Sequence, residues 1–211
     1  MRLGVDEAGK GPVLGSMFAA AVRTDSGALP AGVDDSKTLS SRCREQLAWA
    51  VHDAADAVAV VEVPVERIDD PETDMNALTV AAHAKALAAV AEDGDEGFAD
   101  AADTNAVRFE ETLVDRVPAE VDLRAEHGAD ESRPVVGAAS IVAKVRRDAH
   151  VAALAAEHGD VGSGYPADPA TRAFLREYVA DHGRLPACAR GSWQTSRDAL
   201  AAAEQSSLDE F

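Results

Sequence analysis

Hydrophobic and polar positions along the chain follow two different periods. Apolar and β-branched residues alternate with other residues in four stretches that predict strands: residues 2–6, 13–22, 57–63 and 97–103. Apolar residues recur at helical spacing in six more stretches: residues 40–54, 76–92, 105–114, 135–158, 169–182 and 194–205. After an initial hairpin, strands alternate with helices. This order is typical of an α/β fold with a mixed central sheet flanked by helices, with further helices at the C-terminal end.

The chain of 211 residues is long enough for one domain with a sizeable core, and no long linker divides it. We therefore expect a single domain over residues 1–204, a short flexible tail over 205–211, and a monomer. No apolar run is long enough to span a bilayer, and the N-terminus lacks the pattern of a signal peptide. The sequence therefore predicts a cytoplasmic protein.

The formal net charge of −18 counts against a nucleic-acid partner, because binding to phosphates depends largely on Lys and Arg. The acidic residues are, however, spread along the whole chain, and lysine is rare: it occurs at Lys10, Lys37, Lys85 and Lys144. This composition is typical of adaptation to a salt-rich cytosol, where the Debye length falls to about 3 Å at 1 M salt. The overall charge is then a poor guide to the ligand.

The stretch "GVDEAGKG" at residues 4–11 nearly matches a phosphate-binding P-loop. Gly11, however, stands where the P-loop needs a hydroxyl, and Asp6 and Glu7 would repel a polyphosphate unless a cation lay between them. The stretch indicates either a metal site beside a glycine turn or an ordinary strand followed by a Gly-Pro turn. A third interpretation, transfer of phosphoryl groups between small molecules, follows from the near match to a P-loop.

Acidic side chains mark the ends of two predicted strands. Asp6 and Glu7 end the first one, and Asp103 ends the strand predicted over 97–103. If these strands are parallel neighbours, their carboxyl ends open onto the same crevice. Asp130 precedes a predicted helix and is a fourth candidate. Oxygen ligands without clustered cysteine or histidine favour Mg²⁺ or Mn²⁺ over zinc.

Four motifs occur in a characteristic order: "GVDEAGKGPVLG", "DDSKTLS", "ADESRPVVGAASIVAKVRRD" and "GSGYPADP". Together they closely resemble the type 2 ribonuclease H family, ribonuclease HII, in its archaeal form. The resemblance implies a ribonuclease H-like fold and cleavage of RNA in RNA–DNA hybrids and at single ribonucleotides in duplex DNA. It also implies a site with two divalent ions, whose ligands would be Asp6, Glu7, Asp103 and Asp130.

The same resemblance assigns residues that recognise the substrate. The turn Gly9-Lys10-Gly11 carries Lys where the family usually has Arg, and its backbone would contact the ribose 2′-hydroxyl. Tyr165 would stack on the sugar at the RNA–DNA junction, although a packed Tyr-Pro turn is the alternative. Two positions depart from the family pattern, because Gly128 replaces a common lysine and Arg133 a frequent aromatic residue.

A cationic track for the phosphate backbone is also expected on this acidic protein. Its members would be Ser36, Lys37, Lys144, Arg146 and Arg147. The alternative for Lys144 is an ion pair with Asp148 one helical turn away.

The C-terminal sequence "EQSSLDEF" places Gln205, Leu208 and Phe211 three residues apart. This spacing resembles the motif by which proteins dock on the replication sliding clamp, and the alternative is a frayed acidic terminus.

Two rival functions are open as well: a related two-metal exonuclease, and a clamp-associated protein that binds hybrids without cleaving them.

Overall fold

The computed structural model of the chain describes residues 1–25, 27–33 and 39–209, and for residues 206–209 the backbone alone. Contacts group the chain into two compact units. Unit 1 comprises Met1–Ala8, Met17–Glu62 and Asp74–Arg147, and unit 2 comprises Gly9–Ser16, Val63–Thr73 and Asp148–Phe211. The single domain over residues 1–204 stays a prediction.

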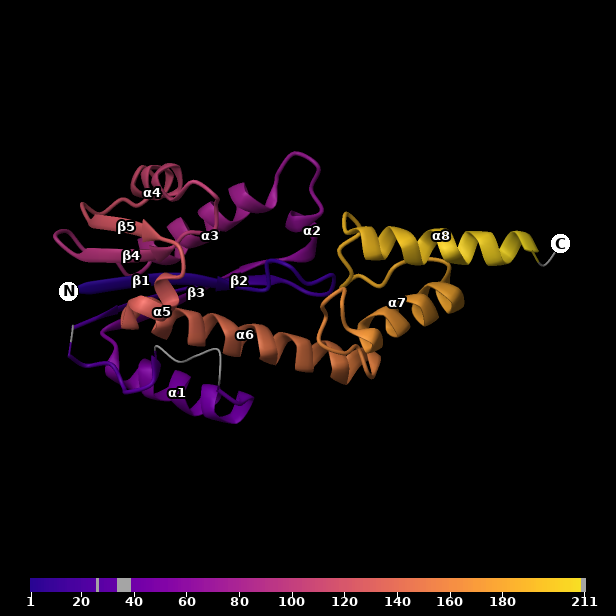
Figure 1. Ribbon diagram of the computed structural model, residues 1–211, viewed down its shortest axis with the longest axis horizontal. Helices are drawn as coiled ribbons and strands as arrows, with labels where there is room; N and C mark the ends of the chain where they lie inside the picture. Colours follow the sequence, from indigo (N-terminus) through magenta and orange to yellow (C-terminus); the bar gives the residue numbers. More distant parts are fainter. Residues whose placement is uncertain (26, 34–38, 210–211) are drawn as a thin grey trace. The chain divides into compact units, whose positions relative to one another are not determined.

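Unit 1 is built on a five-stranded sheet with the order β3-β2-β1-β4-β5 (Figure 1). The strands are β1 Arg2–Ala8, β2 Met17–Thr24, β3 Ala57–Val63, β4 Glu96–Asp100 and β5 Asp122–Glu126. β1 is antiparallel to β2 and parallel to β4, and β4 is parallel to β5. The predicted mixed sheet of an α/β fold is thereby confirmed.

Helices cover both faces of this sheet (Figure 1). α3 (Met75–Ala88) and α4 (Ala106–Val114) pack on the face that carries Leu3 and Val5. α1 (Ser41–Ala54), the short α5 (Ala129–Ser132) and the first part of α6 (Pro134–His158) pack on the opposite face. Side chains alternate between faces along a strand, so Gly4 faces α6. A Cβ atom on Gly4 would lie 2.2 Å from the Val135 carbonyl oxygen, so only glycine lets the helix approach this closely.

Unit 2 packs the end of α6, α7 (Pro169–His182) and α8 (Gln194–Asp209) around a second core, and also contains α2 (Val65–Ile68). Its core residues include Val13, Leu14, Leu175, Val179 and Ala199. Asp168 caps the start of α7, Pro169 is its first residue, and Gly183 ends it in the left-handed conformation with φ of 66°.

Several predicted boundaries are wrong. β2 begins at Met17 rather than at residue 13, because the preceding residues bond to other loops: Val13 N donates to Gly164 O at 2.8 Å. β4 ends at Asp100 rather than 103. The five-residue β5 and the four-residue α2 and α5 were not predicted, since each is too short to show a period. α8 continues through residue 209, and no Gly or Pro after residue 194 stops it.

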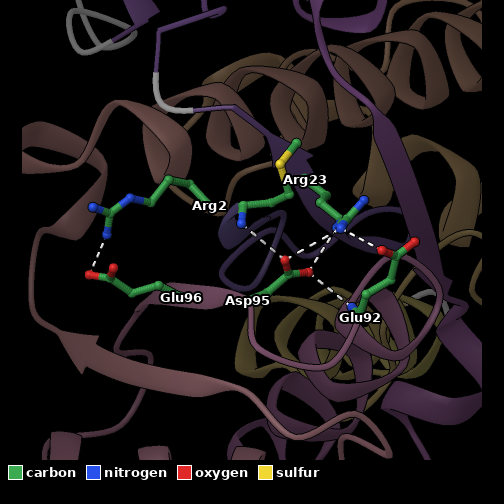
Figure 2. Close-up of polar contacts among 6 residues, drawn as sticks. Arg2, Arg23, Glu92, Asp95 and Glu96 are labelled. Carbon is green, nitrogen blue, oxygen red and sulfur yellow. Dashed lines mark hydrogen bonds and ion pairs between the residues drawn. The ribbon is translucent and has the colours of Figure 1, made fainter.

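A polar cluster secures the N-terminal end of the sheet in unit 1 (Figure 2). The Asp95 carboxylate is 3% exposed and accepts from Arg23 Nε at 2.8 Å and from the Glu92 backbone N–H at 2.9 Å. The Met1 ammonium lies 3.3 Å from its other oxygen. Beside it, the more exposed Arg2 and Glu96 form an ion pair.

No helix among the described residues is both long and apolar enough to cross a membrane.

Candidate active site

The strand register brings two aspartates of unit 1 together. Val5 of β1 pairs with Ala99 of the parallel β4, so the next residues, Asp6 and Asp100, lie side by side and point to the same face of the sheet. Asp100 Oδ1 accepts a hydrogen bond from the Ala129 backbone N–H at 2.8 Å. This bond fixes the start of α5 beside the strand end, and the next residue in α5 is the buried Asp130.

The charges of these acids act on one another. The pKa of the buried Asp6 is raised well above its ordinary value, first by burial and then by the neighbouring charge of Glu7, with a further contribution from Asp100. The pKa of Asp100 is raised by burial and by the charges of Asp130 and Glu7. Asp6, Glu7, Asp100 and Asp130 therefore form one acidic cluster in unit 1, called the carboxylate cluster below.

Two groups partly offset the repulsion at Asp6. The Glu7 backbone N–H donates to Asp6 Oδ1 at 2.7 Å. The Ser140 hydroxyl of α6 also lowers the pKa of Asp6. Its oxygen is buried and forms no regular hydrogen bond with any described residue. Burial and like charge outweigh both, so the ionised Asp6 is held at a cost in free energy.

Asp103, the third acid expected from the sequence, is held by partners of its own. Its Oδ2 accepts from Arg108 Nη2 at 2.5 Å, and its Oδ1 accepts from the Asn105 backbone N–H at 3.0 Å. The hydrogen bond from Arg108 is the main reason that the pKa of Asp103 is lowered to about 2. β4 ends at Asp100, so this aspartate, rather than Asp103, stands at the strand end beside Asp6.

Glu7 leaves the sheet on the face opposite Asp6, because β1 continues as a regular strand through Ala8. There it meets α3, and Glu7 Oε2 lies 2.8 Å from Nε2 of the completely buried His83. His83 Nδ1 has no hydrogen-bond partner among the described residues. The ring N–H is therefore placed on Nε2, which donates to Glu7 Oε2. In the sequence, only a histidine within an apolar stretch points to this pairing.

Lys144 of α6 lies beside the cluster, with Nζ 4.0 Å from Asp130 Oδ2. The carboxylate cluster offers oxygen ligands alone, which fit a hard divalent cation. Among the described residues, no group of three or more Asp, Glu, His or Cys side chains is arranged so that it could hold a metal ion.

The glycine turn and the tyrosine that are expected to bind the ribose both lie in unit 2. Gly9 is buried with φ of 92°, a conformation that favours glycine, whereas Gly11 is exposed. A Cβ atom on Gly11 would lie 3.7 Å from Cε1 of Tyr165, whose side chain is 42% exposed. The glycine turn and the tyrosine are therefore neighbours in unit 2.

The expected cationic track is only partly present. Arg146 is exposed and lines a groove of about 440 Å³ between α1 and α6 together with Trp49 and His52, whereas Lys144 lies toward Asp130. Arg147 is half-buried. Ser36 and Lys37 lie outside the described residues.

Comparison with known proteins assigns the family. The family model described as Ribonuclease HII matches residues 3–196. The chain belongs to the ribonuclease HII family. It is 63% identical to the ribonuclease HII of Haloarcula marismortui over 211 residues, covering 100% of both chains. It is 64% identical to that of Halobacterium salinarum, covering 100% of this chain and 99% of the relative.

Solved ribonuclease structures agree with this assignment. The ribonuclease H2 of Pyrococcus horikoshii superposes with a TM-score of 0.91 at 34% identity, covering 97% of this chain and 99% of the other. The PCNA:RNase HII complex of Archaeoglobus fulgidus gives 0.86 at 36% identity, with 100% of both chains covered. The predictions of a ribonuclease HII and of its halophilic origin are confirmed. The chain is a ribonuclease H, a hydrolase of a family that needs divalent metal ions.

Both departures from the ribonuclease HII pattern have a structural explanation in unit 1. Gly128 caps α5 in the left-handed conformation with φ of 67°, which glycine adopts at the lowest cost. Arg133 donates to both carboxylate oxygens of Glu126, at 2.7 and 3.1 Å, and stacks 4.3 Å from the centre of the Phe98 ring. Arg133 thus replaces an aromatic residue with an ion pair and a cation–π contact.

Proposed function

We propose that this ribonuclease HII cleaves the RNA strand of RNA–DNA hybrids and nicks duplex DNA at single embedded ribonucleotides. The observation that carries the proposal is the carboxylate cluster. In it, Asp6 and Asp100 lie side by side, and the negative charges of Glu7 and Asp130 contribute to raising their pKa values. Like charges gathered at a strand end cost free energy, and a divalent cation among them offsets that cost.

The cluster would hold two Mg²⁺ or Mn²⁺ ions, and the carboxylate oxygens of Asp6, Glu7, Asp100 and Asp130 would be their ligands. Bound ions of this kind activate a water molecule and stabilise the departing oxygen of the phosphodiester. The protein's own part is to hold the ligands: Ala129 N–H orients Asp100, and His83 orients Glu7. Lys144 lies next to Asp130, where a positive charge can meet a substrate phosphate.

Recognition of the substrate would fall to unit 2. The backbone of the Gly9–Gly11 turn would contact the ribose 2′-hydroxyl, and the exposed ring of Tyr165 would pack on the sugar at the RNA–DNA junction. Protein N–H groups and stacking rings are affected little by salt, whereas phosphate contacts weaken steeply as salt rises. Recognition by backbone and ring therefore suits an acidic protein in a salt-rich cytosol.

One experiment tests the site and the reaction together. A DNA duplex with a single ribonucleotide is incubated with Mg²⁺ or Mn²⁺ and with wild type, Asp6→Asn, Asp100→Asn or Asp103→Asn. We expect nicking beside the ribose by wild type, a loss of about 10³-fold or more for the first two variants, and a change of less than about threefold for Asp103→Asn. Duplex binding should persist in all four.

Other outcomes identify the rival functions. A ladder of products from one end would indicate an exonuclease, and a gel shift without cleavage by wild type would indicate a hybrid-binding protein. A large loss for Asp103→Asn with an active Asp100→Asn would reverse the assignment of the third ligand.

We also propose that the C-terminal segment docks on the sliding clamp, PCNA, and that the enzyme acts as a cytoplasmic monomer. The Archaeoglobus fulgidus ribonuclease HII forms a complex with PCNA, and this chain covers that protein completely. Gln205 and Leu208 fall within α8, and Phe211 lies outside the described residues.

A further inference from the structure

A buried arginine of unit 2 contacts the glycine turn. Arg190 is completely inaccessible to solvent, which is rare for a charged side chain. Its guanidinium donates to three backbone carbonyls: Nη2 to Gly9 O at 2.6 Å, Nη1 to Lys10 O at 3.0 Å and Nε to Gly15 O at 2.9 Å. A planar guanidinium can hold several acceptors at once in a fixed geometry.

Trp193 completes this set of contacts. Its indole Nε1 donates to Gly11 O at 3.2 Å, and the Arg190 guanidinium lies 4.9 Å from the centre of its ring. The two side chains therefore take the carbonyl oxygens of all three residues of the turn, Gly9, Lys10 and Gly11. We call Arg190 and Trp193 the carbonyl clamp.

The clamp is itself held in place within unit 2. Arg190 N donates to Val13 O at 2.8 Å, which ties the residue to the segment that follows the turn. On its other side, the Asp69 carboxylate accepts from the backbone N–H groups of Gly191 at 2.7 Å and Ser192 at 3.0 Å. The clamp residues are thus fixed before any ligand binds.

Fixing a carbonyl also fixes the N–H group of the following residue, because the peptide unit is planar and its C=O and N–H point in opposite directions. By holding Gly9 O and Lys10 O, Arg190 therefore orients the N–H groups of Lys10 and Gly11 away from the clamp. Gly11 O precedes Pro12, which has no N–H, so Trp193 instead anchors the end of the turn. A turn with two glycines would otherwise lose much conformational freedom on binding.

We propose that Arg190 and Trp193 are positioning residues that set the Gly9–Gly11 turn in the orientation that distinguishes a ribonucleotide from a deoxyribonucleotide. This inference rests on the proposed role of the turn in contacting the 2′-hydroxyl. The specificity of the enzyme then depends on two side chains that contact the turn from about 180 positions away in the sequence.

The sharpest test is Trp193→Phe, which removes the indole N–H and keeps an aromatic ring against Arg190. The matched control is Trp49→Phe, because Trp49 of unit 1 is 78% exposed and has no part in the proposed site. For each protein, KM and kcat are measured on the single-ribonucleotide duplex, and Ki is measured for an all-DNA duplex of the same sequence as competitor. The ratio of Ki to KM reports discrimination of the ribose.

We expect Trp193→Phe to lower this ratio about 3- to 10-fold, the effect of losing one neutral hydrogen bond, through a higher KM with Ki unchanged. Trp49→Phe should leave the ratio as in wild type. A loss of stability alone would reduce the amount of folded enzyme and leave KM, Ki and their ratio unaltered. An unchanged ratio in Trp193→Phe, or a proportional rise of KM and Ki, would overturn the inference.

Arg190→Lys provides a second measurement, because it keeps the charge but loses the fork that spans three carbonyls. We expect a larger fall in the ratio than for Trp193→Phe. If this variant fails to fold, Trp193→Phe decides alone. A wild-type enzyme that does not discriminate the ribonucleotide duplex from DNA would instead refute the proposed function, which separates the two failures.

Discussion

Replacing Asp95 by Asn should destabilise unit 1 strongly, although Asp95 lies outside the proposed site. The carboxylate is 3% exposed and serves a guanidinium, a backbone N–H and the N-terminal ammonium at the start of β4 (Figure 2). Asn keeps the shape and one oxygen, but removes the charge that two cations face. The substitution therefore isolates the electrostatic part of this contact.

The magnitude follows from the number of charged contacts. Hydrogen bonds to charged groups contribute about 1.5–3 kcal/mol each, and removing one partner of a buried ion pair costs about 3–5 kcal/mol. The amide oxygen of the substituted side chain can still accept from one donor, so we expect the free energy of unfolding to fall by about 3 kcal/mol. This is a large fraction of the ~5–15 kcal/mol that stabilises a typical domain.

The neighbouring pair provides the control. Arg2 and Glu96 are 39% and 44% exposed, so Glu96→Gln should cost less than about 1 kcal/mol. Denaturant titrations in molar potassium chloride, followed by circular dichroism, give both values. Screening by salt acts mainly on exposed charges, so the cost of Asp95→Asn should persist there. Similar costs for the two variants would show that burial of the Asp95 cluster has been misjudged.

The pH dependence gives an independent check of the sign. Burial alone would raise the pKa of Asp95, but hydrogen bonds from Arg23, the Glu92 N–H and the N-terminus outweigh it and lower the pKa. A lowered pKa contributes stability that is complete above the unfolded value of about 3.9 and is lost as the pH falls through the folded value. The difference in stability between wild type and Asp95→Asn should therefore shrink below about pH 4. A difference that grows on acidification would refute the reasoning.

Three further predictions concern other parts of the chain. Gly4→Ala should lower the free energy of unfolding by about 1–3 kcal/mol or more by forcing α6 away, whereas Gly27→Ala, with open space around its Cβ, should be nearly neutral in thermal unfolding. Asp103 should titrate near 2 in a carboxyl NMR experiment, and an Arg108→Gln variant should bring it back toward 4. Phe211→Ala should weaken capture by the sliding clamp and leave cleavage of free hybrid unchanged; equal capture would count against tail docking.

The long helices could be predicted because their ends carry local signals. Residues 169–182 were predicted to the residue, since Asp168, Pro169 and Gly183 mark both ends of α7 in the sequence itself. Strand ends carry weaker signals. Two further alanines, Ala101 and Ala102, follow Asp100, so nothing local shows that pairing with β1 stops there.

That single boundary decided which acid belongs to the carboxylate cluster. Asp6 and Asp130 could be placed near the ends of elements because Gly9 follows the first strand and Pro134 begins the long helix. Choosing between Asp100 and Asp103 required the register of β4 against β1, which is a long-range property. The contacts of His83 with Glu7 and of Arg190 with the glycine turn span 76 and about 180 positions, and no periodicity in the sequence reports them.

The glycine-rich stretch at residues 4–11 shows why a near match to a P-loop is misleading. A P-loop joins a strand to a helix, so that the helix N-terminus helps to bind phosphate. Here β1 is followed by a turn and then by β2, and no helix begins between them. The turn's carbonyls are held by Arg190 and Trp193, and the two acids before it belong to the carboxylate cluster. The same short stretch thus contributes two acids to the carboxylate cluster of unit 1 and a clamped turn to unit 2, an arrangement unlike that of a P-loop.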